Sequence, residues 1–359
     1  MSSARPSYLV KNNFDLVRLI AATQVAIYHA WVHFELPMNG VISALGSLPG
    51  VPAFFFVSGF LISASYEQNP NLWDYARNRI LRIYPALWAT FVFSAATALW
   101  FVDWPSIGKV LVWAISQVTI FQDYHPTFLR SYGVGVANGS LWTIPIEMSF
   151  YVGVPLLYGL AKRIGRLDTL IIIAAICCFT LLYAGMGSFA PETNGYKIFY
   201  VLPTTWGVRF LVGVLAQHHF ERIRRYVEGK FFYYVVLYIV LVQASRLLHI
   251  PLLLKFDGNE IGILVFLGIA GLVLSAAYTK AGLAERLLHQ NDFSYAIYVY
   301  HMPVVNLLIA LQVKSLWSML LAVAGSLSIA VISWFCVEKP ALSLRHHPML
   351  TRQKGLTSS

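Results

Sequence analysis

An arginine and a histidine lie eleven residues apart in the first apolar segment of the chain, "VRLIAATQVAIYHAW" (residues 17–31). In an α-helix, Arg18 and His29 would project from one face, about 16 Å apart along the axis. An arginine within hydrocarbon costs roughly 2.5–3.5 kcal/mol even on the mildest insertion scale. A function can offset that cost, because a guanidinium binds anions and an imidazole transfers protons near neutral pH.

Each of these residues, taken alone, also has a purely structural explanation. Arg18 can extend its side chain to the nearer membrane surface, and His29 can form a hydrogen bond with a neighbouring helix. Asp15 and His33 fall on the same helical stripe. Because ionisable side chains inside a membrane usually mark a functional path, two of them on one stripe favour the functional explanation.

A glutamate in a later apolar segment is the expected partner of this histidine. Glu147 follows Ser140 by seven residues, which places it roughly 10 Å below the expected outer surface. His29 lies about six residues before the outer end of its own segment, so the two side chains should have similar depth. A carboxylate beside His29 would orient the imidazole and support its protonated form. The alternative is that Glu147 only braces a helix interrupted by Pro145.

Three arginines precede the third apolar segment, in "RNRILR" (77–82). Basic residues at the end of a span are often only determinants of topology, and this is our interpretation of Arg77. Arg79 and Arg82, together with Arg18, are candidates for binding phosphate groups through bidentate charge-assisted hydrogen bonds.

Two further positions interrupt apolar runs near the expected middle of the membrane. Ser58 and Gly59 lie within "FFFVSGFLIS" (54–63) and permit close approach of either a helix or a ligand. His301, in "YVYHMP", is followed by Pro303, which can open the helix backbone. His301 would therefore line a reaction site or cap a broken helix.

Composition places most of the chain in lipid. Hydrophobic residues make up 58% of the 359 residues and charged residues only 12%, with a mean hydropathy of +0.63, whereas soluble domains carry about 25% charged residues. The three cysteines all lie in apolar runs, which argues against a disulfide framework. We expect His33, His249, the pair His218–His219 and the pair His346–His347 to lie at surfaces or helix ends. They show no metal-binding spacing, so we expect no metal cofactor.

Ten apolar runs are long enough to cross a bilayer at about 20 residues each. They are 14–35, 48–65, 83–101, 140–160, 169–187, 198–216, 231–248, 261–279, 293–312 and 315–336. An eleventh run, 107–122, is shorter, and we expect it to dip into the outer face without crossing. The first run has an arginine in its interior and no cleavage site after it, so we expect no cleavable signal peptide.

Lysines and arginines fix the expected orientation of these spans. Alternate ends of the ten runs carry 18 basic residues on one side and 5 on the other, with 3 inside the runs. This asymmetry predicts that both termini are cytoplasmic, and it also explains the net charge of +10 without nucleic-acid binding. The sequence predicts an all-α polytopic integral membrane protein with about ten transmembrane helices. Residues 1–340 form its transmembrane domain and residues 341–359 a basic cytoplasmic tail.

Several stretches resemble the acyltransferase-3 family of integral-membrane O-acyltransferases. The first is Arg18-x10-His29, preceded by "NNFDLVR". The others follow in the family's order and are "FFFVSGFLIS", "RNRILRIYPALW", "SLWTIPIEMSFY", "RFLVGVL" and "FSYAIYVYHMPV". Some members carry an appended hydrolase-like domain, for which this chain is expected to be too short.

The resemblance implies acyl transfer from cytoplasmic acyl-CoA, usually acetyl-CoA, to a hydroxyl group of a cell-envelope or secreted glycan, such as a lipopolysaccharide O-antigen or an exopolysaccharide. His29 would be the general base or would form a covalent acyl-histidine, and Glu147 would support it. The coenzyme A phosphates would bind Arg18, Arg79 and Arg82. The remaining expected donor-site residues are Ser58, Gly59 and His301.

Two other functions are compatible with these residues. One is acylation of a small molecule in the cytoplasm. The other is transport of an anionic metabolite along the stripe of Arg18 and His29. The second half of the chain has no counterpart of this stripe, which argues against a transporter built from inverted repeats.

Overall fold

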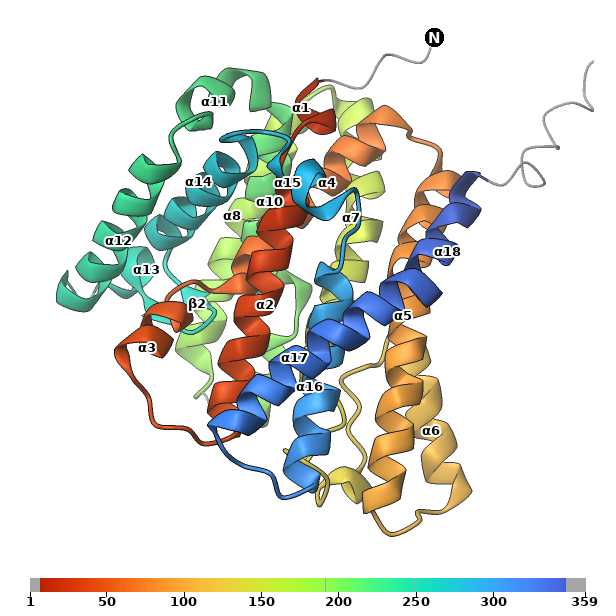
Figure 1. Ribbon diagram of the computed structural model, residues 1–359. Coiled ribbons are helices and arrows are strands. Elements are labelled where there is room, and N and C mark those ends of the chain that lie inside the picture. Colours follow the sequence, from red (N-terminus) through yellow and green to blue (C-terminus); the bar gives the residue numbers. More distant parts are fainter. Residues whose placement is uncertain (1–6, 191, 249, 347–359) are drawn as a thin grey trace, which may run out of the picture.

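Helices make up almost all of the regular structure in the computed structural model, which describes residues 7–190, 192–248 and 250–346 (Figure 1). The first half contains α1 (Ser7–Val10), α2 (Phe14–His33), α3 (Gly40–Gly46), α4 (Gly50–Gln68), α5 (Leu72–Phe101), α6 (Ile107–Val118), η1 (Thr127–Leu129), η2 (Gly139–Trp142), α7 (Thr143–Ile164) and α8 (Leu167–Ser188). The second half contains α9 (Asn194–Tyr200), α10 (Pro203–His218), α11 (Phe220–Val227), α12 (Phe231–Leu248), α13 (Pro251–Leu254), α14 (Ile263–Tyr278), α15 (Leu283–Leu288), α16 (Ser294–Ala310), α17 (Leu316–Ser333), η3 (Trp334–Glu338), α18 (Lys339–Ser343) and η4 (Leu344–His346). Two short antiparallel strands, β1 (Phe256–Asp257) and β2 (Glu260–Ile261), are the exception in the described ranges.

The predicted all-α polytopic membrane protein is confirmed. Each of the ten predicted spans contains a helix, and seven segments of the described chain are long and apolar enough to cross a membrane. They are Gly40–Gln68, Leu72–Phe101, Gly139–Ile164, Leu167–Gly185, Asn194–His218, Phe231–Leu248 and Leu316–Ser343. Helices α14 and α16 are apolar but shorter, and α2 carries the polar residues singled out above. Ten crossings with cytoplasmic termini therefore stay a prediction.

Helix α6 lies along α5 (Figure 1). It has only 12 residues, and Trp113 is fully buried against Phe91 and Phe128. Its length agrees with a segment that does not cross the membrane.

Two glycines bring α4 and α10 into backbone contact. A Cβ atom at Gly59 would lie 2.0 Å from the carbonyl oxygen of Phe210, and one at Gly213 would lie 2.2 Å from that of Phe56. Small residues allow such close packing between helices. Of the two interpretations of Gly59, helix packing is therefore the one that the geometry favours.

Asparagine side chains fix the helices and loops that carry the candidate site. Asn13, just before α2, donates its side-chain amide to the carbonyls of Ala276 (3.3 Å) and Thr279 (3.1 Å) at the end of α14. Asn138 donates to the carbonyl of Val299 (2.7 Å) in α16, and Asn306 of α16 donates to Ala137 (2.9 Å). The irregular segment before α7 is thereby tied to α16, and its backbone groups are satisfied inside the protein.

Candidate active site

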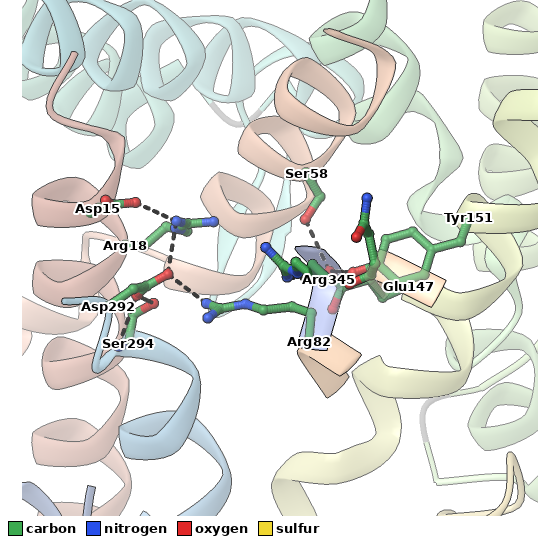
Figure 2. A network of polar contacts seen from close by, with 10 residues as sticks. Asp15, Arg18, Ser58, Arg82, Glu147, Tyr151, Asp292, Ser294 and Arg345 are labelled. Atoms are coloured by element: carbon green, nitrogen blue, oxygen red, sulfur yellow. Dashed lines mark hydrogen bonds and ion pairs between the residues drawn. The ribbon is translucent and has the colours of Figure 1, made fainter. Parts of the chain in front are cut away.

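An aspartate that the sequence analysis did not identify joins two of the predicted donor-binding arginines. Asp292 Oδ2 accepts hydrogen bonds from Arg18 (2.8 Å) and Arg82 (2.5 Å), which approach it from α2 and α5 (Figure 2). Asp15 forms a second ion pair with Arg18 (2.5 Å). Three distant parts of the chain thus meet around one carboxylate.

The position of Asp292 follows from its place at the start of α16. Its Oδ1 accepts hydrogen bonds from the backbone N–H (3.1 Å) and hydroxyl (2.5 Å) of Ser294, an arrangement typical of a helix start. Burial alone would raise the pKa of Asp292, but the guanidinium groups of Arg18 and Arg82 hold it below its usual range. The signal that could have identified it is the pattern Asp-x-Ser directly before an apolar run.

Glu147 lies on the opposite side of the same polar region (Figure 2). Its Oε1 accepts hydrogen bonds from Tyr151 (2.5 Å) and Ser58 (3.3 Å). The guanidinium of Arg79 lies 5.6 Å from the centre of the Tyr151 ring, within cation–π range. Glu147 is therefore surrounded by α4, α5 and its own helix α7.

A cavity of about 110 Å³ separates these groups. Five of the eight predicted site residues line it, and they are Arg18, Ser58, Arg79, Arg82 and Glu147. Gly59 does not line it, because its Cα faces α10. The cavity continues to Thr143 and Tyr298, one helical turn before His301.

One more arginine lies beside this cavity. Arg345 donates to the carbonyl of Asn78 (3.3 Å), and its own carbonyl accepts a hydrogen bond from Arg77 (2.7 Å). Burial and the nearby positive charges of Arg79 and Arg82 lower the pKa of Arg345 to about 10. Crowded guanidinium groups of this kind favour binding of an anion. No sequence pattern predicts this contact, because Arg345 lies in the segment that we interpreted as a basic tail.

His29 and His301 form a hydrogen-bonded pair. His29 Nδ1 lies 3.0 Å from His301 Nε2, and His301 Nδ1 lies 2.7 Å from the carbonyl oxygen of Tyr298. A carbonyl only accepts, so His301 Nδ1 carries a proton. In the neutral pair, His301 Nε2 is then the acceptor for the Nδ1 proton of His29. His29 Nε2 is consequently left with a free lone pair.

The expected contact between His29 and Glu147 is not formed. In the part of the chain that the structure describes, no hydrogen bond joins them, and His29 pairs with His301 instead. The reason is the packing of α2, in which His29 meets His301 of α16, while Glu147 of α7 faces α4 and α5. Helix α16 is also continuous through Pro303, so His301 does not cap a broken helix.

The tandem histidines expected at the surface are only partly described. His218 and His219 have donor atoms that, with those of Asp168, lie within 4.8 Å of one another. Their contacts read as surface ion pairs, with His219 Nε2 3.0 Å from Asp168 and His218 Nδ1 3.3 Å from Glu67. His249 and His347 lie outside the described residues.

Comparison with known proteins identifies the family of the chain. The family model described as "Acyltransferase domain", that of acyltransferase-3, matches residues 11–338. "Nodulation protein 10" of Rhizobium leguminosarum bv. viciae is 32% identical over 93% of this chain and 94% of its own length. The "O-acetyl transferase" of Shigella phage Sf6 is 24% identical over 95% and 98% of the two chains.

A longer relative matches over part of its length. The "Peptidoglycan O-acetyltransferase OatA" of Listeria monocytogenes is 24% identical over 91% of this chain, which covers 55% of that protein. No solved structure matches. The family match and the rhizobial relative both extend over nearly the whole chain, and the chain is a membrane-embedded acyltransferase of the acyltransferase-3 family.

Proposed function

We propose that this protein transfers an acetyl group from cytoplasmic acetyl-CoA to a hydroxyl group of a cell-envelope or secreted glycan. A lipopolysaccharide O-antigen and an exopolysaccharide are the acceptors we favour, and the bacterial cytoplasmic membrane is the expected location. The names of relatives that align with almost the whole chain support O-acetyl transfer. The observation that carries the proposal is the His29–His301 pair, because it supplies an imidazole nitrogen, and His301 is bonded to the carbonyl of Tyr298, a residue that lines the cavity with the arginines.

The donor would bind with its phosphate groups at the arginines. The 3′-phosphate and pyrophosphate of coenzyme A are matched by Arg79, Arg82 and Arg18, which line the cavity, and by Arg345 beside it. At about 110 Å³ the cavity is too small for the whole of coenzyme A. Only the thin pantetheine arm would enter it, and the nucleotide would stay at the cytoplasmic end.

The reaction would proceed at His29. Its Nε2 removes the proton from the acceptor hydroxyl, whose oxygen attacks the thioester carbonyl carbon. The carbon–sulfur bond breaks, and the coenzyme A thiolate leaves and receives the proton from the imidazolium. Attack by Nε2 itself, which would give an acyl-histidine, uses the same lone pair and stays an open alternative.

His301 and Glu147 would have different tasks. His301 is a positioning residue, since the Tyr298 carbonyl fixes its tautomer and it fixes that of His29. Glu147 contacts Ser58 and Tyr151 on the arginine side of the cavity. In our proposal Glu147 holds the side chains of the donor site in place. His301, and not Glu147, orients the imidazole of His29.

An assay with purified protein in lipid nanodiscs tests the proposal. The protein is given acetyl-CoA and a purified surface glycan, while free thiol and acetylated glycan are measured together. We expect both to appear in equal amounts and only when both substrates are present. Acetyl-CoA left intact would indicate transport, and thiol release only when a cytosolic small-molecule fraction replaces the glycan would indicate the other enzyme function. In cells, mass spectrometry should find an acetyl increment on surface glycans that depends on the gene.

A further inference from the structure

A second and larger cavity lies on the other side of α10. It has a volume of about 590 Å³ and is bounded by α8, α10, the β1–β2 hairpin and α14. Its walls are mainly aromatic and aliphatic, with Phe179, Trp206 and Phe266 among them. None of its lining residues lines the smaller cavity. By the expected topology it faces the outer half of the membrane.

One wall of this large cavity carries a buried positive charge. The side chain of Arg209, in the candidate span Asn194–His218, lines the cavity although the residue is only 5% exposed. Its guanidinium donates to the carbonyl of Thr205 (3.0 Å) and, at 3.5 Å, to that of Ile261, and it lies 4.9 Å from the Trp206 ring. Its Nε has no hydrogen-bond partner. No ion pair of the described residues includes Arg209.

The nearest acidic side chain that lines the cavity is already paired. Lys255 donates to Glu260 (2.6 Å) across the hairpin, so these two charges cancel each other. Among the described residues that line the cavity, no acidic side chain is therefore left to balance the positive charge of Arg209. A buried guanidinium in this setting calls for an anion, and arginine is a residue of choice for recognising phosphate, which its planar fork binds through two hydrogen bonds.

We infer that the large cavity binds an amphiphile with a phosphate head, placing the phosphate at Arg209 and the hydrocarbon against the aromatic and aliphatic walls. A free phosphate would leave those walls in contact with water, whereas an uncharged chain would leave Arg209 without its anion. The site is separate from the donor site and does not depend on the proposed function.

Four probes separate the parts of this ligand. Binding is measured from the melting temperature of the protein in a nonionic maltoside detergent, which carries no phosphate. Dodecyl phosphate, used below its micelle concentration, should raise the melting temperature in a saturable way. Dodecanol, inorganic phosphate and dodecyltrimethylammonium should bind at least tenfold more weakly. Equal binding of inorganic phosphate would overturn the lipid assignment, and equal binding of dodecanol would overturn the role of the charge.

Three variants localise the binding. Arg209→Met removes the charge at similar length, and Leu252→Trp fills the cavity from its exposed rim while keeping Arg209. Each should weaken dodecyl phosphate binding at least tenfold. Arg246→Met removes an exposed arginine that does not line the cavity and should bind as the unchanged protein does. If Arg209→Met fails to fold, Leu252→Trp decides, and unchanged binding by that variant overturns the proposal.

Discussion

Arg18 and Asp292 are 274 positions apart in the sequence, yet their side chains lie 2.8 Å apart. Eleven residues further along α2, His29 meets His301 of α16 at 3.0 Å. The same two helices are thus joined by an ion pair near one end and by a histidine pair near the other. Two polar contacts at different heights fix both the rotation and the register of α2 against α16, and with them the geometry of the candidate site.

Replacing Asp292 by Asn should destabilise the protein by about 3 kcal/mol, the low end of the range for breaking a buried ion pair. The low end applies because Arg18 and Arg82 keep side-chain exposures of 23% and 17%. The measurement is the melting temperature in detergent, with the exposed Asp103→Asn as the matched control.

The same variant should change the acid stability. Because the pKa of Asp292 is held below its usual range, its carboxylate stabilises the fold above the unfolded-state pKa of about 4 and loses this effect as the pH falls further. Asp292→Asn should lack this pH-dependent stabilisation, so its stability should fall less below a pH of about 4. If the unchanged protein and Asp292→Asn were equally stable at neutral pH, the ion pairs of Asp292 would contribute nothing to the stability of the fold.

Arg79→Ala and Arg82→Ala should raise the KM for acetyl-CoA by about 10- to 100-fold, because each removes charge-assisted hydrogen bonds to the donor phosphates. The KM for the glycan should stay nearly constant. Arg77→Ala is the control, since that side chain contacts the Arg345 carbonyl and does not line the cavity. If the first two variants bound acetyl-CoA normally, Arg79 and Arg82 would not bind the donor and would serve only as determinants of topology.

Gly59→Ala should destabilise the protein by about 1–3 kcal/mol, because the new Cβ would meet the Phe210 carbonyl at 2.0 Å. Gly153→Ala in α7 is the matched control: a Cβ there has no neighbour within 4 Å. That control should be neutral or stabilising by up to about 1 kcal/mol. Comparing the two melting temperatures tests whether Gly59 serves packing. If Gly59→Ala had a normal melting temperature but impaired donor binding, Gly59 would belong to the donor site and not to helix packing.

Fusions to alkaline phosphatase test the topology. The enzyme should be inactive when fused near Gly165 or Glu228 and active near Asn194 or Gly258, since the 18-to-5 distribution of basic residues places the first two in the cytoplasm. The reverse pattern would show that the protein has the opposite orientation in the membrane, with the arginine-lined cavity at the outer face.

Local patterns in the sequence were sufficient to predict the helices and the shared face of Arg18 and His29. Apolar length identifies a membrane helix, and helical geometry sets which side chains align within it. They were also sufficient to choose five residues that line one cavity, because arginines, a glutamate and a serine are conspicuous among apolar neighbours.

The partners of those residues could not be predicted in the same way. Whether His29 meets Glu147 or His301 depends on which helix packs against the part of α2 that carries His29. Both candidate partners are expected at a similar depth, so the sequence does not favour either one. Asp292 and Arg345 lie outside the apolar runs and resembled ordinary loop and tail residues until the fold brought them to the cavity. Long-range packing, which no single segment encodes, decides these contacts.

His301 provides a test of positioning that a merely structural role would not pass. His301→Leu removes the acceptor of the His29 Nδ1 proton and should lower kcat strongly, with little change in the KM for acetyl-CoA. His301→Gln offers an amide oxygen at a similar place and should recover part of kcat. Equal melting temperatures with unequal kcat would separate positioning from stability.

We propose that His29 Nε2 performs the chemistry, and the decisive measurement is acetyl transfer by purified His29→Gln. Glutamine keeps similar volume and hydrogen bonding, but its amide neither accepts the hydroxyl proton nor forms an acyl-enzyme. With acetyl-CoA saturating and folding confirmed by melting temperature, kcat should fall by about 10²–10⁴. Acetylation of the glycan by His29→Gln at a rate near that of the unchanged protein would contradict both forms of the mechanism.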